Sequence, residues 1–504
     1  SRVEFSPWHV TTFDQNDTVS EPGNQWLAKR SAPSASTEEK RAAELTTVHT
    51  NTPSMTILDS LGREVLAIAH NRYKDRGGVV RDEKYVTFTR LDAEGKPLWI
   101  RDVRGNIVMR YTVPRTSASD PLTDFYPTYD IAGNLIFQHS MDAGDRWMLN
   151  DAAGKPLCAW DFNERHDGTG TSIPEHRRFF TKYDELRRPL ETSLTINEGA
   201  SQTIERFVYV DGPSGDKAKN LRGQLRQHFD QSGLTHVEAY DFKGQTLEVH
   251  RQLAADYKAS MLHWPESNPA SSLEAERFVK ITEYDALSRM TRLFNWHHGI
   301  GSRVAVYEPE YSERGILKSE ELIVGATKTA TGYSEEAGSK RDQVIQDITY
   351  DAKGQRLSIS YGNKTVTQYH YDPETYRLLQ LRTTRTVINP EFPKEKGFKD
   401  PHILQNLYYT YDPVGNITEI FDDAVEPAYF KNQAVESHNL YTYDSLYRLL
   451  SGTGRENAAD VGMPGPTEPP PMVVQFPITD PNAPRARMGF TPNRFRPFHA
   501  GPLG

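Results

Sequence analysis

Carboxylates recur along this 504-residue chain, and two carboxylates held together can perform general acid–base or glycosidase chemistry. Each belongs to a short phrase in which an aromatic residue precedes Asp and Gly or a substitute follows three positions later, as in YDPVG at 411–415. A catalytic pair requires one special environment, whereas many equivalent turn aspartates each need only a backbone amide. We therefore expect no catalytic residue here, and interpret the phrase as architecture.

A second candidate is the phrase DQNDTVSEPGNQ, which begins at Asp14 like a calcium-binding loop. Asp14, Asn16 and Thr18 alternate as the oxygen ligands of such a loop do. Val19, however, stands where the loop has Gly, and Gln25 stands where it has Glu. We therefore prefer Asx-turns that cap the end of a strand, and expect no bound metal.

Other chemistry-bearing residues lack the spacing of known sites. His297 and His298 are not part of a His-Glu-x-x-His phrase, so a surface turn after Trp296 is the preferred interpretation. The phrase GTGTS at 168–172 is polar and does not join a strand to a helix, which argues against phosphate binding. Cys158, the only cysteine, is expected to be a packed and inert thiol. We predict no cofactor.

The elements that would position the aspartates are β-hairpins. Asp at the first position of a tight turn accepts backbone hydrogen bonds, and Gly at the fourth position tolerates a positive φ. Strands are indicated by alternation, since GQRLSISYG places Leu357, Ile359 and Tyr361 on one face. Asp230 and Asp241 are 11 residues apart, which is the length of one strand and one turn.

Tyrosines that precede the aspartates would occupy the same point of successive hairpins and pack against neighbours across strands. The hairpins would then stack side by side into one long sheet. The residues predicted to build this structural repeat are Tyr129, Asp130, Gly133, Tyr183, Asp184, Tyr240, Asp241, Gly244, Tyr284, Asp285, Tyr350, Asp351, Gly354, Tyr411, Asp412, Gly415, Tyr443 and Asp444.

Three parts are expected along the chain. They are a lead-in segment with a loop and a short helix at 1–50, a YD-repeat sheet at 51–456, and a Pro-rich divergent tail at 457–504. Helical periodicity is best at 36–45, STEEKRAAEL, with Ser or Thr as the N-cap. Residues 20–36 and 461–484 are predicted loops, and the polar insertions at 256–275 and 386–403 are expected to decorate the sheet.

Composition limits the partners. Hydrophobic residues make up 37% and aromatic residues 11%, so the core should be thin and rich in rings. The net charge is −9, which argues against a nucleic-acid partner. A single Cys excludes an intramolecular disulfide framework. We expect no membrane span and see no signal peptide, and the opening SRVEFSPW suggests a piece of a longer protein.

The repeated phrases resemble the YD (RHS) repeats of bacterial polymorphic toxins and insecticidal toxin-complex proteins. Further stretches similar to the repeat region of those proteins are RVEFSPWHVTTFDQNDTV at 2–19, RWMLNDAAGKPLCAWD at 146–161, YDELRRP at 183–189, NLRGQLRQHFDQSGLTHVEAYDFKGQ at 220–245 and YTYDSLYRLLSGTGRE at 441–456. The resemblance implies an all-β fold, a long spiral of antiparallel YD-repeat hairpins that forms part of a hollow shell. It covers about residues 2–456.

The resemblance also implies a function. Such shells enclose a toxic polypeptide, so the expected role is a non-enzymatic shell segment of a secreted or extracellular toxin. The expected partners are the enclosed toxin polypeptide, the remaining parts of the shell and other toxin-complex subunits. The family's autoprotease phrase, DPxGxxxPDPxG, does not occur in this sequence, so neither self-cleavage nor a toxin is assigned to it.

A binding surface is the alternative function, because exposed rings on repeat proteins contact glycans or receptors. The candidate residues are Trp8, Trp26, Trp99, Trp147, Trp160, Trp264 and Trp296. Burial of these indoles would favour the shell.

Overall fold

The computed structural model describes residues 1–75, 77–166, 169–211, 217–267, 269–387, 398–430, 433–457 and 495–500. Twenty-nine strands are assigned to one sheet, and two further sheets have two strands each. The strand pairs given below are all antiparallel, which confirms the predicted all-β, antiparallel class. Residues divide into two compact units, 1–87 with 345–504, and 88–344, which are described separately.

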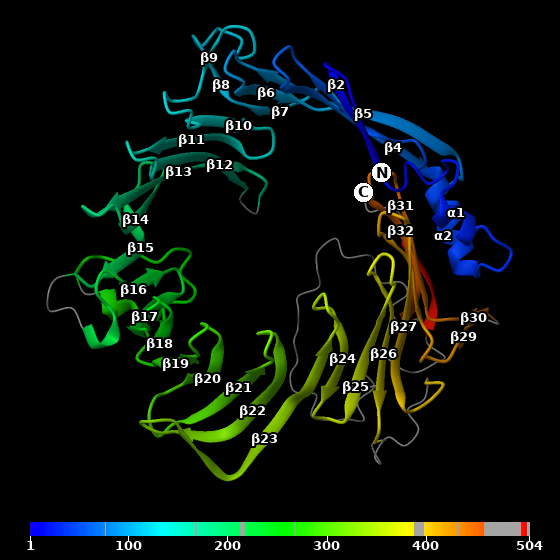
Figure 1. Ribbon diagram of the computed structural model, residues 1–504. Coiled ribbons are helices and arrows are strands. Elements are labelled where there is room, and N and C mark those ends of the chain that lie inside the picture. Colours follow the sequence, from blue (N-terminus) through cyan, green and yellow to red (C-terminus); the bar gives the residue numbers. More distant parts are fainter. Residues whose placement is uncertain are drawn as a thin grey trace. The chain divides into compact units, whose positions relative to one another are not determined.

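Unit 2, residues 88–344, is a series of neighbouring strands that pair in chain order (Figure 1). They are β6 (Pro97–Arg101), β7 (Ile107–Arg110), β10 (Phe137–Ser140), β11 (Gly144–Asn150), β12 (Pro156–His166), β13 (Ser172–Tyr183), β14 (Pro189–Ile196), β15 (Gln202–Tyr209), β16 (Leu225–Asp230), β17 (Gly233–Tyr240), β18 (Thr246–Leu253), β19 (Phe278–Tyr284), β20 (Met290–His297), β21 (Arg303–Tyr311) and β22 (Leu317–Lys328). Each pairs antiparallel with the next. The small sheet of β8 (Thr112–Pro114) and β9 (Phe125–Pro127) lies between β7 and β10 in the chain.

Unit 1, residues 1–87 and 345–504, contains two such series. The first joins β1 (Arg2–Phe5), β2 (His9–Phe13), β3 (Ser54–Leu58) and β4 (Glu64–Lys74). The second joins β24 (Arg356–Tyr361), β25 (Thr365–Tyr371), β26 (Leu378–Arg385), β27 (Ile403–Tyr411), β28 (Ile417–Asp422), β31 (His438–Tyr443), β32 (Leu449–Asn457) and β33 (Phe495–Ala500). A small hairpin is formed by β29 (Ala428–Phe430) and β30 (Gln433–Val435), while β5 (Val80–Leu91) and β23 (Tyr333–Tyr350) contribute residues to both units.

Two helices interrupt unit 1 between β2 and β3. The predicted helix is confirmed as α2 (Thr37–Val48), with Ser36 as N-cap and a capping box completed by Glu39. The prediction of a loop over 20–36 was wrong in part, because α1 (Gln25–Arg30) forms there. The side chain of Asn24 caps α1 by accepting a hydrogen bond from the amide of Leu27. This N-cap is the sequence feature that indicates the start of the helix, and it is a single residue.

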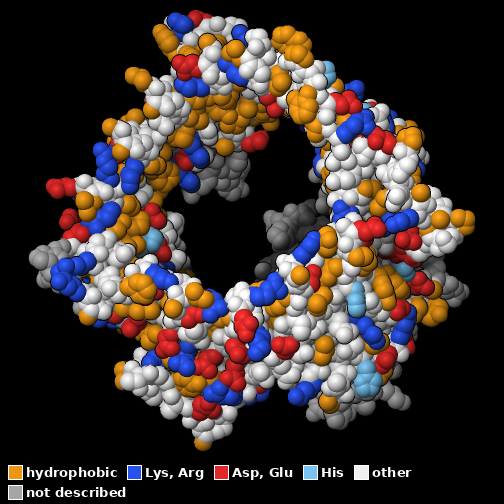
Figure 2. Space-filling view, in the orientation of Figure 1, with side chains coloured by type: hydrophobic (Ala, Val, Ile, Leu, Met, Phe, Trp, Pro, Cys, Tyr) orange, Lys and Arg blue, Asp and Glu red, His pale blue; other side chains and the backbone are white. Residues whose placement is uncertain are grey.

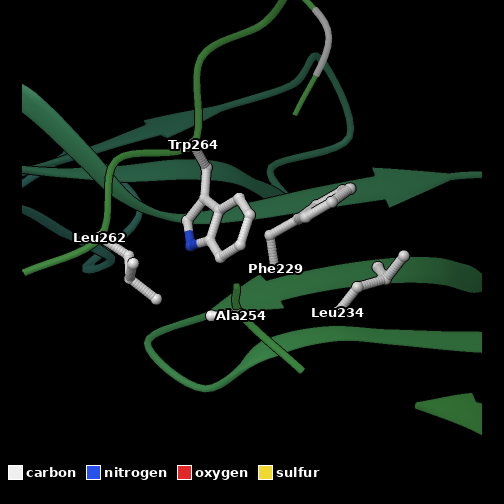
Figure 3. Packing of buried hydrophobic residues seen from close by; sticks show 5 residues of the cluster. All are labelled: Phe229, Leu234, Ala254, Leu262 and Trp264. Atoms are coloured by element: carbon white, nitrogen blue, oxygen red, sulfur yellow. The ribbon is translucent and has the colours of Figure 1, made fainter. Parts of the chain in front are cut away.

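The insertion at 256–275 was predicted only to decorate the sheet. In the structure it also buries apolar side chains against the sheet. Trp264 is 0% exposed and packs with Leu262 of the same insertion against Phe229, Leu234 and Ala254 (Figure 3). The indole nitrogen donates to the carbonyl of Asp230 at 3.0 Å, so its polar atom is satisfied as well. The predicted loop at 461–484 and residues 388–397 of the second insertion lie outside the described residues.

Replacing Trp264 by Ala should destabilise unit 2 by about 3–5 kcal/mol, because a large enclosed side chain leaves a cavity. Urea unfolding followed by tryptophan fluorescence and circular dichroism would measure the change. Trp296→Ala is the matched control, since Trp296 is 43% exposed and its removal should cost about 0.5 kcal/mol or less. Equal losses for the two variants would contradict this account of the insertion.

Candidate functional site

The repeat turns share one hydrogen-bonding scheme. In the turn that follows Tyr350, Asp351 Oδ1 accepts from the amides of Lys353 and Gln355 at 2.8 Å each. Asp351 also donates its own amide to the carbonyl of Gln355 at 2.9 Å, and Gly354 donates back to the carbonyl of Asp351 at 3.2 Å. The carboxylate therefore bonds to the inside of its own hairpin end.

A bond from the amide four positions later to the turn carboxylate recurs at all of the predicted aspartates, Asp130, Asp184, Asp241, Asp285, Asp351, Asp412 and Asp444. At Asp285, hydrogen bonds from the backbone and side chain of Arg289 hold the pKa of the carboxyl below its usual value. Each of these carboxylates bonds to its own turn. The turn aspartates are therefore spread along the sheet and are not held together as a pair of carboxylates.

The fourth position of the turn adopts a positive φ whether or not it is Gly. Gly354 has φ +87°, and the other predicted glycines, Gly133, Gly244 and Gly415, have +84°, +86° and +122°. Where Gly is missing, Arg187, Ser288 and Tyr447 take φ values of 60°, 67° and 63°. These turns place Arg after the substituted position, and its guanidinium binds the turn carboxylate at 2.6–2.7 Å in the pairs Arg188–Asp184, Arg289–Asp285 and Arg448–Asp444. A side-chain ion pair therefore accompanies the less favourable backbone conformation.

The repeat tyrosines connect neighbouring hairpins through their hydroxyl groups. Tyr240, the last residue of β17, donates to the carbonyl of Leu225, the first residue of β16, at 2.6 Å. Five others donate in the same way to the first residue of an earlier strand, namely Tyr129 to Pro97, Tyr183 to Pro156, Tyr371 to Arg356, Tyr411 to Leu378 and Tyr443 to Ile417, at 2.6–3.0 Å. We call this bond the tyrosine clasp.

Ring-to-ring packing, which the sequence predicted between neighbouring hairpins, is a lesser part of the contact. Tyr129 packs on Tyr111 at 6.4 Å between centroids, and Tyr411 packs on Tyr409 of its own strand at the same distance. The repeat tyrosines Tyr284 and Tyr350 end β19 and β23. The structural role assigned to the repeat residues stays a prediction that mutations can test.

A cation lies over several clasp rings. Lys96 and Lys155 precede the acceptor prolines directly and lie 5.5 and 5.6 Å from the ring centroids of Tyr129 and Tyr183. Arg377 lies 5.8 Å from the ring of Tyr411. These are cation–π contacts at the outer limit of their range. Burial raises the pKa of Tyr129 to about 12, so its hydroxyl remains a donor at neutral pH.

The other sequence candidates are structural groups in the described residues. Asp14 Oδ1 accepts from the amides of Asn16 and Asp17 at 2.8 and 3.0 Å, which confirms the predicted Asx-turn. No group of three or more His, Cys, Asp or Glu side chains in the described part of the chain is arranged to hold a metal ion. Cys158 is half-buried, and desolvation raises the pKa of its thiol.

The expectation of a surface turn at His297 and His298 was wrong for the first of them. His297 ends β20 and is 2% exposed, with Nδ1 2.9 Å from the carbonyl oxygen of Asn295. Its neighbour His298 is exposed. The strand runs one residue beyond Trp296, because Val279 of β19 pairs with His297.

The tryptophans named for the binding alternative are mostly packed. Trp264 is buried and Trp26, Trp99, Trp147 and Trp160 are half-buried, while Trp8 and Trp296 are exposed. None of the helices within the described ranges combines the length and apolar character needed to cross a bilayer.

Removing the clasp hydroxyl in Tyr240→Phe should destabilise unit 2 by about 1–3 kcal/mol, because the carbonyl of Leu225 loses its partner next to a side chain that is 7% exposed. Urea unfolding measures the loss. The control is Tyr257→Phe, since Tyr257 is 81% exposed and its hydroxyl should contribute little. A clasp variant as stable as this control would show that ring packing alone joins the hairpins.

The turn geometry predicts that Gly354→Ala costs about 1 kcal/mol, because its φ of +87° disfavours any side chain. A Cβ at this position meets nothing within 4 Å, so the cost is conformational and not steric crowding. Gly332→Ala is matched, as its Cβ also meets nothing within 4 Å and its φ lies outside the positive range. The midpoint of thermal unfolding should therefore be lower for Gly354→Ala than for Gly332→Ala. Identical midpoints would contradict the turn assignment.

Comparison with known proteins gives close agreement in fold and clear sequence relatedness, although no protein-family model matches the chain. The chain is 30% identical over 430 residues to toxin subunit YenC2 of Yersinia entomophaga, covering 84% of this chain and 40% of that protein. It is 26% identical over 411 residues to toxin subunit YenC1 of the same organism, covering 82% and 38%. The chain thus spans about two fifths of the length of these curated relatives.

Solved structures of other toxin-complex proteins match as well. The crystal structure of TcdB2-TccC3 matches with a TM-score of 0.69 and 25% identity, over 99% of this chain and 20% of that one. The Photorhabdus luminescens Tc holotoxin pore, with a mutated TccC3, matches with a TM-score of 0.67 and 26% identity, over 91% and 18%. Together with the repeat turns, these matches show that the chain resembles the YD-repeat (RHS-repeat) region of toxin-complex subunits.

Proposed function

We propose that the chain is a non-enzymatic wall segment of a toxin-complex-like shell that encloses a toxin polypeptide. The observation that carries this proposal is the tyrosine clasp, through which six tyrosine hydroxyls bond to backbone carbonyls of earlier strands. A wall must be continuous, and antiparallel pairing with the clasp gives two kinds of bond between neighbours. The relatives are toxin subunits by name, and one neighbouring structure is a Tc holotoxin pore.

One face of strands β11, β12 and β13 supports the enclosure of a polypeptide. Three cross-strand rows lie on this face: Leu149 with Cys158 and Phe180, Trp147 with Trp160 and Arg178, and Phe162 with His176. We call these eight residues the apolar face. Leu149, Phe162 and Phe180 are 45%, 39% and 42% exposed, although large apolar side chains of a sheet are usually covered. Hydrophobic side chains gather over this part of unit 2 in Figure 2.

An unfolded polypeptide is the partner that such a face fits. Its rings and aliphatic side chains offer non-directional contacts, which suit a chain without a fixed shape. A shallow cavity of about 320 Å³ between Trp160, Phe162 and Arg178 would accept a single side chain. Enclosure in this way would keep the toxin apart from solvent until release.

The free edge of β1 supports assembly with other parts of the shell. β1 pairs with β2 on one side, and the described residues provide no strand for its other side. Its four residues are exposed, and Phe5 and Trp8 are 78% and 58% exposed. An unpaired edge with apolar side chains is a template for another strand. The remaining shell and other toxin-complex subunits are therefore the proposed partners.

The proposal includes the three sequence-predicted parts, a lead-in at 1–50, the repeat wall at 51–456 and a divergent tail at 457–504. It also places the protein outside the producing cell, as part of a secreted toxin. A glycan- or receptor-binding surface remains the alternative, resting on Trp8 and Trp296 as the exposed tryptophans.

The full chain should bind a chemically unfolded polypeptide, and a Trp160→Ser, Phe180→Ser double variant should bind it at least tenfold more weakly, because aromatic anchors carry most of such contacts. Fluorescence anisotropy with labelled, reduced and carboxymethylated α-lactalbumin provides the measurement. Phe242→Ser, at a turn residue that is 82% exposed, is the matched control and should bind like the wild type. Equal affinity for all three chains would reject the apolar face as the contact with cargo.

A further inference from the structure

Residues 14–52, which we call the clamp, form a separate excursion within unit 1. The strands on either side of it, β2 and β3, pair directly with each other, so the sheet does not require the clamp. It contains α1 and α2, and it lies beside the later strands of the same unit, including β27 and β31 (Figure 1). Its function is therefore not explained by the repeat.

The loop at the start of the clamp binds the turn that follows β27. Asn16 Nδ2 donates to Asp412 Oδ2 at 2.9 Å, and Asn16 Oδ1 accepts from the amide of Val414 at 3.2 Å. Asn16 and Asp412 are 0% and 3% exposed, and Asp444 of the next turn is 1% exposed, whereas the other predicted turn aspartates are half-buried. The next turn contributes as well, since the hydroxyl of Tyr447 donates to Asp14 Oδ2.

The helix of the clamp binds backbone on neighbouring strands. Arg41 of α2 donates to the carbonyls of Thr418 and Tyr441 at 2.8 and 3.1 Å. The amide of Arg72 on β4 bonds to Ser445 Oγ at 2.7 Å, and its guanidinium reaches the carbonyl of Thr50 at 2.8 Å. Polar contacts thus hold the clamp, together with the buried apolar side chains of Val19, Ala42 and Ala43.

His49, which follows α2, lies at the centre of these contacts and is 5% exposed. Its Nε2 is 3.0 Å from the carbonyl oxygen of Tyr443, and a carbonyl can only accept, so the neutral ring carries its hydrogen on Nε2. The other nitrogen, Nδ1, is buried without a hydrogen-bond partner among the described residues. A proton added at Nδ1 would therefore create a buried, charged donor with no acceptor.

Three carboxylates and one phenol lie near His49. Asp412, Asp444 and Asp14 attract a positive charge on its ring, and the ring of Tyr447 meets the imidazole edge-on at 6.5 Å. The three carboxylates already accept bonds from protein donors. Burial outweighs their attraction and holds the pKa of His49 below its usual value.

We propose that His49 makes the docking of the clamp onto the last two repeat turns acid-sensitive. With a neutral imidazole the clamp stays docked, and protonation at Nδ1 favours its release. The sign follows from linkage: the released clamp binds the proton more tightly than the docked one, so docking is stable above about pH 6.5 and weakens as the pH falls below it. The pairing of β2 with β3, which does not involve the clamp, would persist.

Hydrogen–deuterium exchange on the full chain tests the proposal. Protection of the amides in residues 14–52, corrected for intrinsic rates, should fall up to about tenfold between pH 7.5 and 5.5, since pH 5.5 is about one unit below the free imidazole pKa. Protection in β14, which contains no histidine, should stay constant. His49→Gln keeps a donor for the Tyr443 carbonyl but cannot titrate, and it should abolish the fall. His370→Gln, at an exposed site on β25, should leave the fall unchanged.

The pH profile of the wild type decides the question even if His49→Gln fails to fold. A loss of amide protection that begins near pH 6.5 and has the pH dependence of one titrating group supports the proposed role of His49. Constant protection down to about pH 5 overturns the proposal, as does loss only near pH 4, where carboxylates titrate. A folded His49→Gln chain that loses protection like the wild type would also overturn it.

Discussion

A hydroxyl group at the end of one strand binds the first carbonyl of an earlier strand, and this bond is the constraint on which the repeat depends. Antiparallel pairing joins each strand to its neighbours, but it leaves the ends of hairpins free to splay. Tyr240 and Leu225 show how the ends are fixed, with the acceptor at the point where β16 begins. Because the carboxylate of each turn bonds to its own backbone, the hairpin end is rigid when the hydroxyl reaches it.

Local features of the fold could be predicted from sequence because their causes are local. Asp351 and Gly354 predict a turn, and alternation after it predicts β24. The capping box of Ser36 and Glu39 likewise lies within four residues. The sequence predicted contacts between these tyrosines and neighbouring hairpins through their rings. It did not predict the hydroxyl bond of the clasp, because the backbone carbonyl that accepts it has no sequence signature.

Tertiary contacts account for what the sequence did not reveal. Trp264 stands in a polar, Pro-containing insertion, and only the sheet surface it meets explains its complete burial. His297 reads as part of a surface turn until its pairing with Val279 is known. The bonds between Asn16 and Asp412 join residues 396 positions apart, so no local pattern could have indicated them. The half-exposed rings of the apolar face are similarly invisible, since alternation shows which residues share a face but not whether that face is covered.

The acceptor in the clasp is a main-chain atom, and this has a consequence for how such proteins can change. The acceptor residues include Pro97, Leu225, Arg356 and Ile417, so the bond does not require one particular residue type at the acceptor position. A hairpin therefore recognises its neighbour by position and not by composition. Duplication, loss or exchange of hairpins during evolution would leave the junctions intact, which allows a wall of this kind to vary in extent and in surface while its joints stay the same.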